Sequence, residues 1–260
     1  MPVKNIKSVL ITGAAQRIGR AIALTLAADG WSVGVHYNSS EQHAHGLVAE
    51  IRQQGGKAEA IQADLLDEKE LAHLITTAKS TLGGLNCLIN NAAVFEKDSL
   101  LDSNQETWNR HFQINLRAPF VLIQNFAQEL SDSLPDSVAG NIINIIDQRV
   151  WNLSPGFASY TLSKSALWAL TQTAAATLAP RIRVNAIGPG PTLPSIHQTQ
   201  QQFDQQCESV PLKHGAKPEE IASTVRFILE APSITGQMIA VDGGQHLGFA
   251  PGVPKNNLDG

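Results

Sequence analysis

Short apolar runs alternate along the chain with longer segments that have one polar and one apolar face. The apolar runs predict strands at Val9–Ile11, Ser32–His36, Lys57–Gln62, Asn86–Asn90, Ile142–Ile146, Arg183–Ile187 and Gln237–Val241. Several are apolar throughout, which is typical of strands covered on both faces. The longer segments predict helices at Ile18–Ala28, Glu41–Gln54, Glu68–Leu82, Gln105–Leu130, Ala158–Leu178 and Pro218–Leu229. This alternation predicts a doubly wound α/β fold with a mostly parallel sheet of about seven strands.

The composition is that of a single globular domain. The chain has 260 residues, of which 43% are apolar and 16% charged, and no linker rich in Pro, Gly or Ser divides it. Single α/β domains often reach this length. We therefore expect one domain over residues 1–248 and a C-terminal tail at 249–260, which is either poorly ordered or reaches a neighbouring subunit.

Charge and cysteine content argue against several classes of partner. The formal net charge is -4, and no run of Lys or Arg suggests binding to nucleic acid or to an anionic membrane. No apolar stretch reaches about 18 residues, and the first residues are too polar for a signal peptide. Cys87 and Cys207, the two cysteines, fit neither a disulfide framework nor a metal site. The expected location is the cytoplasm, and no metal is expected.

A turn of small residues joins the first predicted strand to the first predicted helix. It reads TGAAQRIG from Thr12 to Gly19. Small residues let backbone amides approach a pyrophosphate, and the helix N-terminus adds a partial positive charge. The spacing GxGxxG is absent, so a plain strand–helix turn is the alternative. We expect a dinucleotide here because ligands of doubly wound sheets bind beyond the carboxyl ends of strands.

Arg17 and the end of the second strand predict which dinucleotide binds. A guanidinium in the first turn could pair with the 2′-phosphate of NADP. The second strand ends in the polar run 36–40, HYNSS, without the acid that sites for NAD usually place there. We therefore expect NADPH/NADP as the cofactor. The alternative is that Arg17 is only a solvated residue of the first helical turn.

Tyr160 and Lys164 stand four residues apart in the predicted helix Ala158–Leu178. This spacing places both side chains on one face of the helix. A lysine ammonium in that place is expected to lower the pKa of the Tyr160 phenol and so make it a usable acid near neutral pH. The pair alone is a weak signal, since YxxxK often arises by chance.

Further motifs follow the predicted strands in a fixed order. They are Asn90–Ala93, Asp147, Asn185–Gly190 and Val241–Gly244, with Asn115 inside the predicted helix 105–130. Together with Thr12-Gly13 and the Tyr160/Lys164 pair, this ordered set resembles the short-chain dehydrogenase/reductase family from Ser8 to Gly244. The resemblance implies a Rossmann-type fold and a small-molecule substrate. It also implies a homotetramer, because members of the family commonly assemble through the helix that carries the tyrosine.

The resemblance implies a role for each matching residue. Tyr160 would give or take the proton, Lys164 would also bind the nicotinamide ribose, and Asn115 would hold a water of a proton relay. With Asp147, these are the predicted catalytic residues. Asn90 would stabilise the sheet near the cofactor. The predicted cofactor-binding residues are Gly13, Arg17, Ile18, His36, Tyr37, Asn38, Ser39, Ser40, Asp64, Leu65, Asn91, Ala92, Ala93, Tyr160, Lys164, Pro189 and Gly190.

Asp147 is the best clue to the substrate, because the family usually has Ser at this position. Asp147, Arg17 and Phe95, with the later stretch Val210–Leu212, together resemble the pteridine reductase subgroup, which includes bacterial dihydromonapterin reductases. The implied reaction is reduction of a dihydropterin by NADPH. The predicted substrate-binding residues are Arg17, Phe95, Asp147 and Tyr160. Taken singly, Phe95 could also be a core or lid aromatic, and Asp147 a harmless variant or a helix-capping acid.

Two other functions stay open on the sequence. One is a carbonyl or 3-oxoacyl thioester reductase built on the same scaffold. The other is a catalytically silent NADPH-binding sensor or scaffold, against which the intact Asn115, Tyr160 and Lys164 argue, because binding alone needs no proton relay. The polar, Gln-rich segment Thr192–Glu208 is expected, by the same resemblance, to form a substrate lid.

Overall fold

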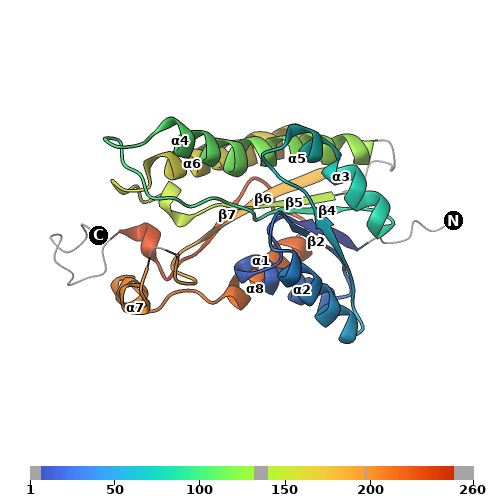
Figure 1. Ribbon diagram of the computed structural model, residues 1–260, viewed down its shortest axis with the longest axis horizontal. Coiled ribbons are helices and arrows are strands. Elements are labelled where there is room, and N and C mark those ends of the chain that lie inside the picture. Colours follow the sequence, from blue (N-terminus) through green and yellow to red (C-terminus); the bar gives the residue numbers. More distant parts are fainter. Residues whose placement is uncertain (1–6, 132–139, 197, 249–260) are drawn as a thin grey trace.

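All seven predicted strands pair into one parallel sheet. In the computed structural model, which describes residues 7–131, 140–196 and 198–248, the strand order is β3-β2-β1-β4-β5-β6-β7 (Figure 1). The strands are β1 (Ser8–Ile11), β2 (Ser32–Tyr37), β3 (Lys57–Gln62), β4 (Cys87–Asn90), β5 (Gly140–Ile145), β6 (Ile182–Pro189) and β7 (Met238–Val241). The predicted doubly wound fold is confirmed. The tail expected at 249–260 lies outside the described residues.

Helices cover both faces of the sheet (Figure 1). One face carries α1 (Arg17–Ala28), α2 (Glu41–Gln53) and α8 (Pro218–Glu230), and the other carries α3 (Glu68–Leu82), α5 (Ala118–Ser131) and α6 (Ala158–Leu178). In β1, Val9 and Ile11 join the first core and Leu10 the second, because successive side chains of a strand point to opposite faces. Within the described ranges, no helix is long and apolar enough to cross a membrane.

The predicted helix 105–130 is interrupted in the structure. It consists of α4 (Gln105–Phe112), the π-helical turn η1 (Gln113–Arg117) and α5. Pro119 gives a physical reason, since proline has no N–H for the carbonyl four residues earlier and its ring crowds that carbonyl. The π turn contains Asn115, which is fully buried. The irregularity thus coincides with a residue of the predicted site.

The expected lid segment contains a helix that the hydrophobic pattern did not predict. This helix, α7, spans Gln200–Ser209 and has no buried residue. It begins with a capping box, in which the side chains of Thr199 and Gln202 each accept a hydrogen bond from the other's backbone N–H. Two short 3₁₀ turns, η2 (Gln148–Val150) and η3 (Gln245–Leu247), follow β5 and β7.

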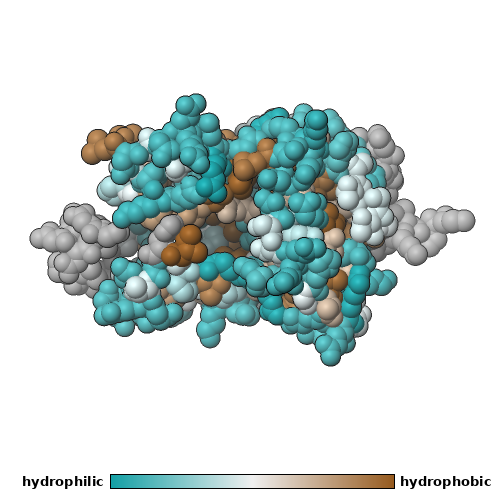
Figure 2. Space-filling model, in the orientation of Figure 1, coloured by the Kyte–Doolittle hydropathy of each residue, from teal (hydrophilic) through white to brown (hydrophobic). Residues whose placement is uncertain are grey.

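The order of the strands creates a crevice at the carboxyl ends of the strands, between β1 and β4 inside the sheet. The chain runs outward from β1 to β3 and returns to β4 beside β1. The loops after β1 and β4 therefore diverge and leave a crevice beyond the carboxyl ends of the strands. Figure 2 shows the molecule hollowed on this face, between the layer that holds α4 and α6 and the part that holds α7.

Candidate active site

The turn after β1 is built around two glycines. Gly13 has a φ of +62°, in the left-handed region that favours glycine, and a Cβ on Gly19 would lie 2.4 Å from the carbonyl oxygen of Gly13. Asn91 Nδ2 donates to the carbonyls of Thr12 at 2.9 Å and of Gly13 at 3.0 Å. The Thr12 hydroxyl accepts from the N–H groups of Asn91 and Ala92. The Asn91 side chain therefore stabilises the turn through hydrogen bonds to its backbone.

His36 supports the same turn from the end of β2. Its Nδ1 accepts from the N–H of Gly13 at 3.1 Å, and its Nε2 lies 3.1 Å from the carbonyl oxygen of Ala63. Because the N–H of Gly13 can only donate, the ring is neutral and its proton is on Nε2. Burial lowers the pKa of His36 to about 4. The imidazole is thus engaged in shaping the turn, whereas direct contact with a cofactor was expected.

Arg17 begins α1 and reaches the expected lid segment. Its φ of 54° is uncommon for a residue other than glycine. Its guanidinium donates to the carbonyls of Leu193 at 3.2 Å and of Pro194 at 3.0 Å. A guanidinium has five N–H donors, so these two bonds leave donors for an anion. The contact with the lid segment was not predicted, because nothing local in the sequence names a partner so distant along the chain.

The edge of the crevice at β2 and β3 is polar. Asn38 and Ser39 are exposed beyond β2, and Asp64 accepts from the N–H of Leu66 at 2.9 Å within its own turn. Leu65, by contrast, is buried in the core. Contact of Leu65 with a cofactor stays a prediction.

The ends of β4 and β6 pack closely against their neighbours. Asn90 donates from Nδ2 to Oδ1 of Asn144 at 2.8 Å and so ties β4 to β5. Gly190 follows Pro189 at the end of β6, and a Cβ on Gly190 would lie 2.6 Å from Cα of Asp242. Only glycine lets the two chain segments after β6 and β7 come this close.

Tyr160, Asp147 and Lys164 meet where β5 ends. The Tyr160 hydroxyl donates to Oδ2 of Asp147 at 2.9 Å. Lys164 Nζ donates to the carbonyl of Ile145 at 2.8 Å and lies 5.9 Å from the centroid of the Tyr160 ring. Asp147 Oδ1 accepts from the N–H of Arg149 at 2.8 Å, so Asp147 also caps η2. Both oxygens of this carboxylate are therefore hydrogen-bond acceptors.

The electrostatics of this group differ from the expectation. Burial, and next the Asp147 carboxylate, raise the pKa of Tyr160 well above its usual value of 10. Burial lowers the pKa of Lys164 to about 8. The prediction that Lys164 lowers the pKa of the phenol is therefore wrong, because burial and the nearby negative charge both favour the neutral form. Tyr160 is held as a neutral hydroxyl with its proton in place.

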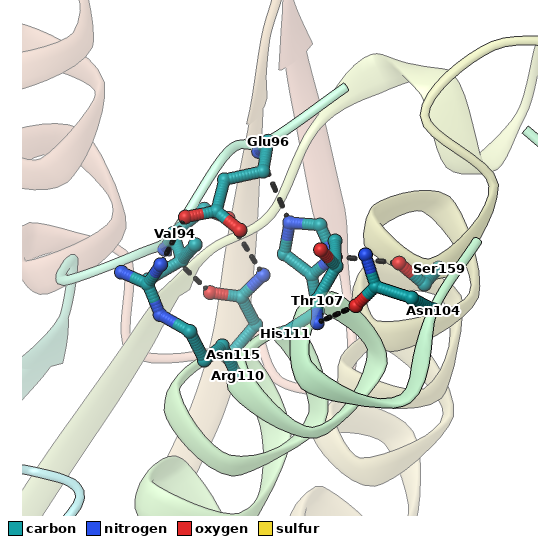
Figure 3. A network of polar contacts seen from close by, with 8 residues as sticks. All are labelled: Val94, Glu96, Asn104, Thr107, Arg110, His111, Asn115 and Ser159. Carbon is teal, nitrogen blue, oxygen red and sulfur yellow. Dashed lines mark hydrogen bonds and ion pairs between the residues drawn. The ribbon is translucent and has the colours of Figure 1, made fainter. Parts of the chain in front are cut away.

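Asn115 joins the π turn to the loop after β4. Its Oδ1 accepts from the N–H of Val94 at 2.8 Å, and its Nδ2 donates to the carbonyl of Val94 at 3.0 Å and to Oγ of Ser163 at 3.1 Å. Figure 3 shows the amide facing the backbone of Val94. Asn115 thus fixes the loop after β4 against α6. Its role in holding a water stays a prediction.

Phe95 and Phe157 form an aromatic wall beside Tyr160. The two phenylalanine rings stack with centroids 4.2 Å apart and an angle of 8° between their planes. Phe95 also meets Tyr160 edge-on at 4.7 Å, and the guanidinium carbon of Arg149 lies 5.1 Å from the Phe157 centroid. Sequence reasoning missed Phe157 and Arg149. Helical spacing could not have found Phe157, because it precedes α6 in the left-handed conformation.

The residues present fit a dinucleotide. The N-terminus of α1 and the glycine turn would hold the phosphates, since α1 begins shortly after the small residues Gly13, Ala14 and Ala15 and a helix N-terminus suits an anion. Lys164 and Tyr160 would meet the nicotinamide ribose at the other end of the crevice. Among the described parts of the chain, no group of His, Cys, Asp and Glu could hold a metal ion.

Fold and site together define an oxidoreductase of the short-chain type. The sequence family described as Enoyl-(Acyl carrier protein) reductase matches residues 13–246, and the chain belongs to this short-chain dehydrogenase/reductase family. The 3-oxoacyl-[acyl-carrier-protein] reductase FabG of Staphylococcus epidermidis is 35% identical over 246 residues, which are 93% of this chain and 99% of the relative. The 3-oxoacyl-[acyl-carrier-protein] reductase of Synechocystis is 35% identical over 239 residues, 90% and 95% of the two chains.

Solved structures of relatives cover nearly the whole chain. FolM alternative dihydrofolate reductase 1 from Brucella suis, in complex with NADP, is 45% identical with a TM-score of 0.88, over 94% of this chain and 96% of that one. Its counterpart from Brucella canis, also with NADP, is 44% identical with a TM-score of 0.89, over 97% and 98%. The relatives thus carry two different activities in their names, and the substrate has to be argued from the site.

Proposed function

We propose that the protein reduces a dihydropterin to a tetrahydropterin with NADPH, with dihydromonapterin or dihydrobiopterin as representative substrates. The observation that carries this proposal is the hydrogen bond from Tyr160 to Asp147, 2.9 Å long, beside the ring of Phe95. An aromatic face suits a flat ring substrate and adds contact area without requiring a hydrogen bond. The chain is also more similar to the FolM structures, at 45% and 44% identity, than to the FabG relative at 35%. The NADP in both FolM structures supports NADPH as the cofactor.

The reaction adds a hydride to a ring carbon and a proton to the adjacent nitrogen. NADPH, when bound, supplies the hydride. Tyr160 supplies the proton, because burial and Asp147 raise its pKa and keep it protonated. Asp147 orients the phenol before the transfer, and its negative charge favours the return of a proton to the phenolate afterwards. The protonated Lys164 side chain offsets the negative charge of the phenolate.

The same carboxylate argues against reduction of a simple carbonyl. In the family, the Ser that usually occupies this position would polarise the carbonyl by donating a hydrogen bond. Here Asp147 accepts through both oxygens, from Tyr160 at 2.9 Å and from the N–H of Arg149 at 2.8 Å. A carboxylate has no O–H to donate. Reduction of a 3-oxoacyl thioester, the activity that the FabG relatives are named for, is the alternative.

The proposal includes a cytoplasmic homotetramer. Leu162 of α6 is 48% exposed, so the helix that carries Tyr160 presents an apolar side chain to a partner subunit. Sedimentation velocity measures the number of subunits directly.

A panel of substrates tests the proposed reaction. NADPH oxidation is followed with dihydromonapterin, dihydrobiopterin, dihydrofolate and an acetoacetyl thioester side by side, and we expect the two dihydropterins to react fastest. Phe95→Ala should raise the pterin KM up to about tenfold, the scale of one aromatic contact. Asp147→Ser should lower pterin kcat by about 10²-fold.

Phe112 offers a matched control for Phe95. It is half-buried and its ring stacks on Trp108, with centroids 4.3 Å apart. Its ring partner is thus Trp108 and not Tyr160, so Phe112→Ala should leave the pterin KM unchanged. Good turnover of the acetoacetyl thioester, with none of any dihydropterin, would reject the proposal and favour the alternative.

A further inference from the structure

Three buried polar side chains beside Tyr160 have no part in the proposed reaction. They are Asp98 in the loop after β4, His111 of α4 and Ser159 of α6. His111 Nδ1 lies 2.6 Å from Oγ of Ser159, and the Ser159 hydroxyl donates to Oδ2 of Asp98. Figure 3 shows the imidazole of His111 between Ser159 and the backbone of Glu96. The three side chains form one continuous network.

The hydrogen bonds in this network run in one direction. His111 Nε2 accepts from the N–H of Glu96 at 3.1 Å, so Nε2 carries no proton and Nδ1 does. Nδ1 then donates to Ser159, and Ser159 donates to Asp98. Burial lowers the pKa of His111, which agrees with a neutral ring. Because Ser159 gives its proton to a carboxylate and not to the imidazole, the three residues are not an activated nucleophile.

Asp98 caps α6 from a distant part of the chain. Phe157, which precedes the helix, has a φ of 60° and makes no side-chain capping bond. The backbone carbonyl of Asp98 instead accepts from the N–H of Phe157 at 2.7 Å. Both carboxylate oxygens accept from the N–H of Ser159 at 3.2 Å. Burial acts to raise the pKa of Asp98, but hydrogen bonds from Ser159 and Ser103 outweigh it and the pKa is lowered. The resulting negative charge suits a helix N-terminus.

The network connects the two sides of the candidate site. On one side, Asp98 and the N–H of Glu96 belong to the loop that carries Phe95. On the other side, Ser159 directly precedes Tyr160 in α6. Phe95 and Tyr160 meet edge-on at 4.7 Å. The spacing between these two rings therefore depends on how the loop is bonded to the first turn of α6.

We infer that Asp98, Ser159 and His111 are positioning residues, which set the spacing between the Phe95 ring and the Tyr160 hydroxyl. The inference rests on the proposed function for the role of Tyr160 as proton donor. It needs no contact between the network and the substrate. A displacement of about 1 Å, even from a change far from the chemistry, can lower a rate by on the order of 10²-fold.

Ser159→Ala tests this inference with a small change. It removes the hydroxyl that links His111 to Asp98 and keeps the backbone cap of α6. We expect kcat to fall about tenfold, while the Kd for NADPH, measured by fluorescence titration, stays at the native value. Asp98→Asn, a second variant of nearly the same shape, should lower kcat in the same way.

A variant of another helix cap separates positioning from stability. Asn104 caps α4 by accepting from the N–H of Thr107 at 2.9 Å (Figure 3). Asn104→Ala should lower Tm and leave kcat and KM unchanged. All variants are assayed at one temperature well below their Tm values.

The outcomes for the network and for the proposed function are distinguishable. The variants are compared on whichever substrate the native protein reduces, a dihydropterin or the acetoacetyl thioester. A native protein without dihydropterin activity overturns the proposed function and leaves this comparison possible. The inference itself is overturned if Ser159→Ala lowers Tm but keeps the native kcat and KM. It is equally overturned if Asn104→Ala loses as much kcat as Ser159→Ala.

Discussion

A carboxylate, rather than a second hydroxyl, holds the Tyr160 phenol. The hydrogen bond to Asp147 places negative charge next to a group that must itself become negative when it gives up its proton. That arrangement makes Tyr160 a weaker acid than a free tyrosine. A weak acid transfers its proton only when the acceptor becomes strongly basic, and hydride arrival at a ring C=N bond has this effect on the nitrogen. The residue-level chemistry therefore favours a substrate whose basicity rises during the reaction.

The two tyrosines of the chain allow a matched test of this role. Tyr160→Phe should lower kcat by about 10²–10⁴-fold, the usual loss when a positioned acid is removed. The Kd for NADPH should stay near the native value, because the phenyl ring and Lys164 remain. Tyr37→Phe, the other tyrosine substitution, should leave kcat at saturating NADPH unchanged, because Tyr37 is predicted to bind the cofactor and has no part in the proton transfer. Near-native turnover by Tyr160→Phe would move the proton donor elsewhere, with Asp147 the first group to examine.

Among the elements, those with an apolar pattern were predictable and those without one were not. The buried strands could be recognised because runs such as Val9–Ile11 must be covered on both faces. The helix α7 has no buried residue, so no hydrophobic spacing could reveal it. At the site, the positions of residues were predictable but their pKa values were not. The place of Tyr160 beside Lys164 follows from helical spacing. The raised pKa of Tyr160 depends on burial and on Asp147, which belongs to another part of the chain.

The turn after β1 is expected to be sensitive to acid. An unfolded histidine takes up a proton near its usual pKa of 6.5, whereas burial lowers the pKa of His36 in the folded protein to about 4. Between these two values the unfolded state binds more protons, so the free energy of unfolding falls as the pH falls from 6.5 towards 4. Urea unfolding at several pH values measures this loss. It should be smaller in His36→Asn, whose amide oxygen can still accept from the N–H of Gly13 but cannot titrate.

A suitable control is His73→Asn, because His73 lies exposed on α3. If His36→Asn and the native protein lose equal stability over this pH range, the buried imidazole is not the source of the acid sensitivity.

At the scale of the whole molecule, the crevice lies between segments far apart in sequence. Arg17, at the first turn, bonds to the carbonyls of Leu193 and Pro194 in the segment before α7. The same guanidinium has further donors for a phosphate. We therefore expect this one residue both to recognise the cofactor and to hold the expected lid segment in place. The two roles predict different effects of an Arg17 substitution on the KM values for NADPH and NADH.

Arg17→Ala should raise the KM for NADPH more than that for NADH. A charge-assisted bond to the 2′-phosphate is worth on the order of 1–3 kcal/mol, and NADH lacks that phosphate. Arg20→Ala is the matched control, since Arg20 lies on the same helix and pairs with Glu50 instead. Steady-state kinetics with both cofactors measures the difference. An equal rise in both KM values would mean that Arg17 acts through the lid segment and does not read the phosphate.

The π turn at Gln113–Arg117 has a consequence for the deletion of a single residue from this helix. A π turn accommodates one residue more than the α-helical turn that it replaces. Each residue of an α-helix advances the side chains by about 100° around the axis. Loss of a single residue from this turn would keep the chain continuous and the apolar content almost the same. It would turn the π turn into a regular α-helical turn, so α4 and α5 would keep nearly their present rotation and the change would fall on the residues of the turn itself. Asn115 would then rotate away from Val94 and Ser163. The contacts of Asn115 thus depend on the number of residues in this helix as well as on their identity.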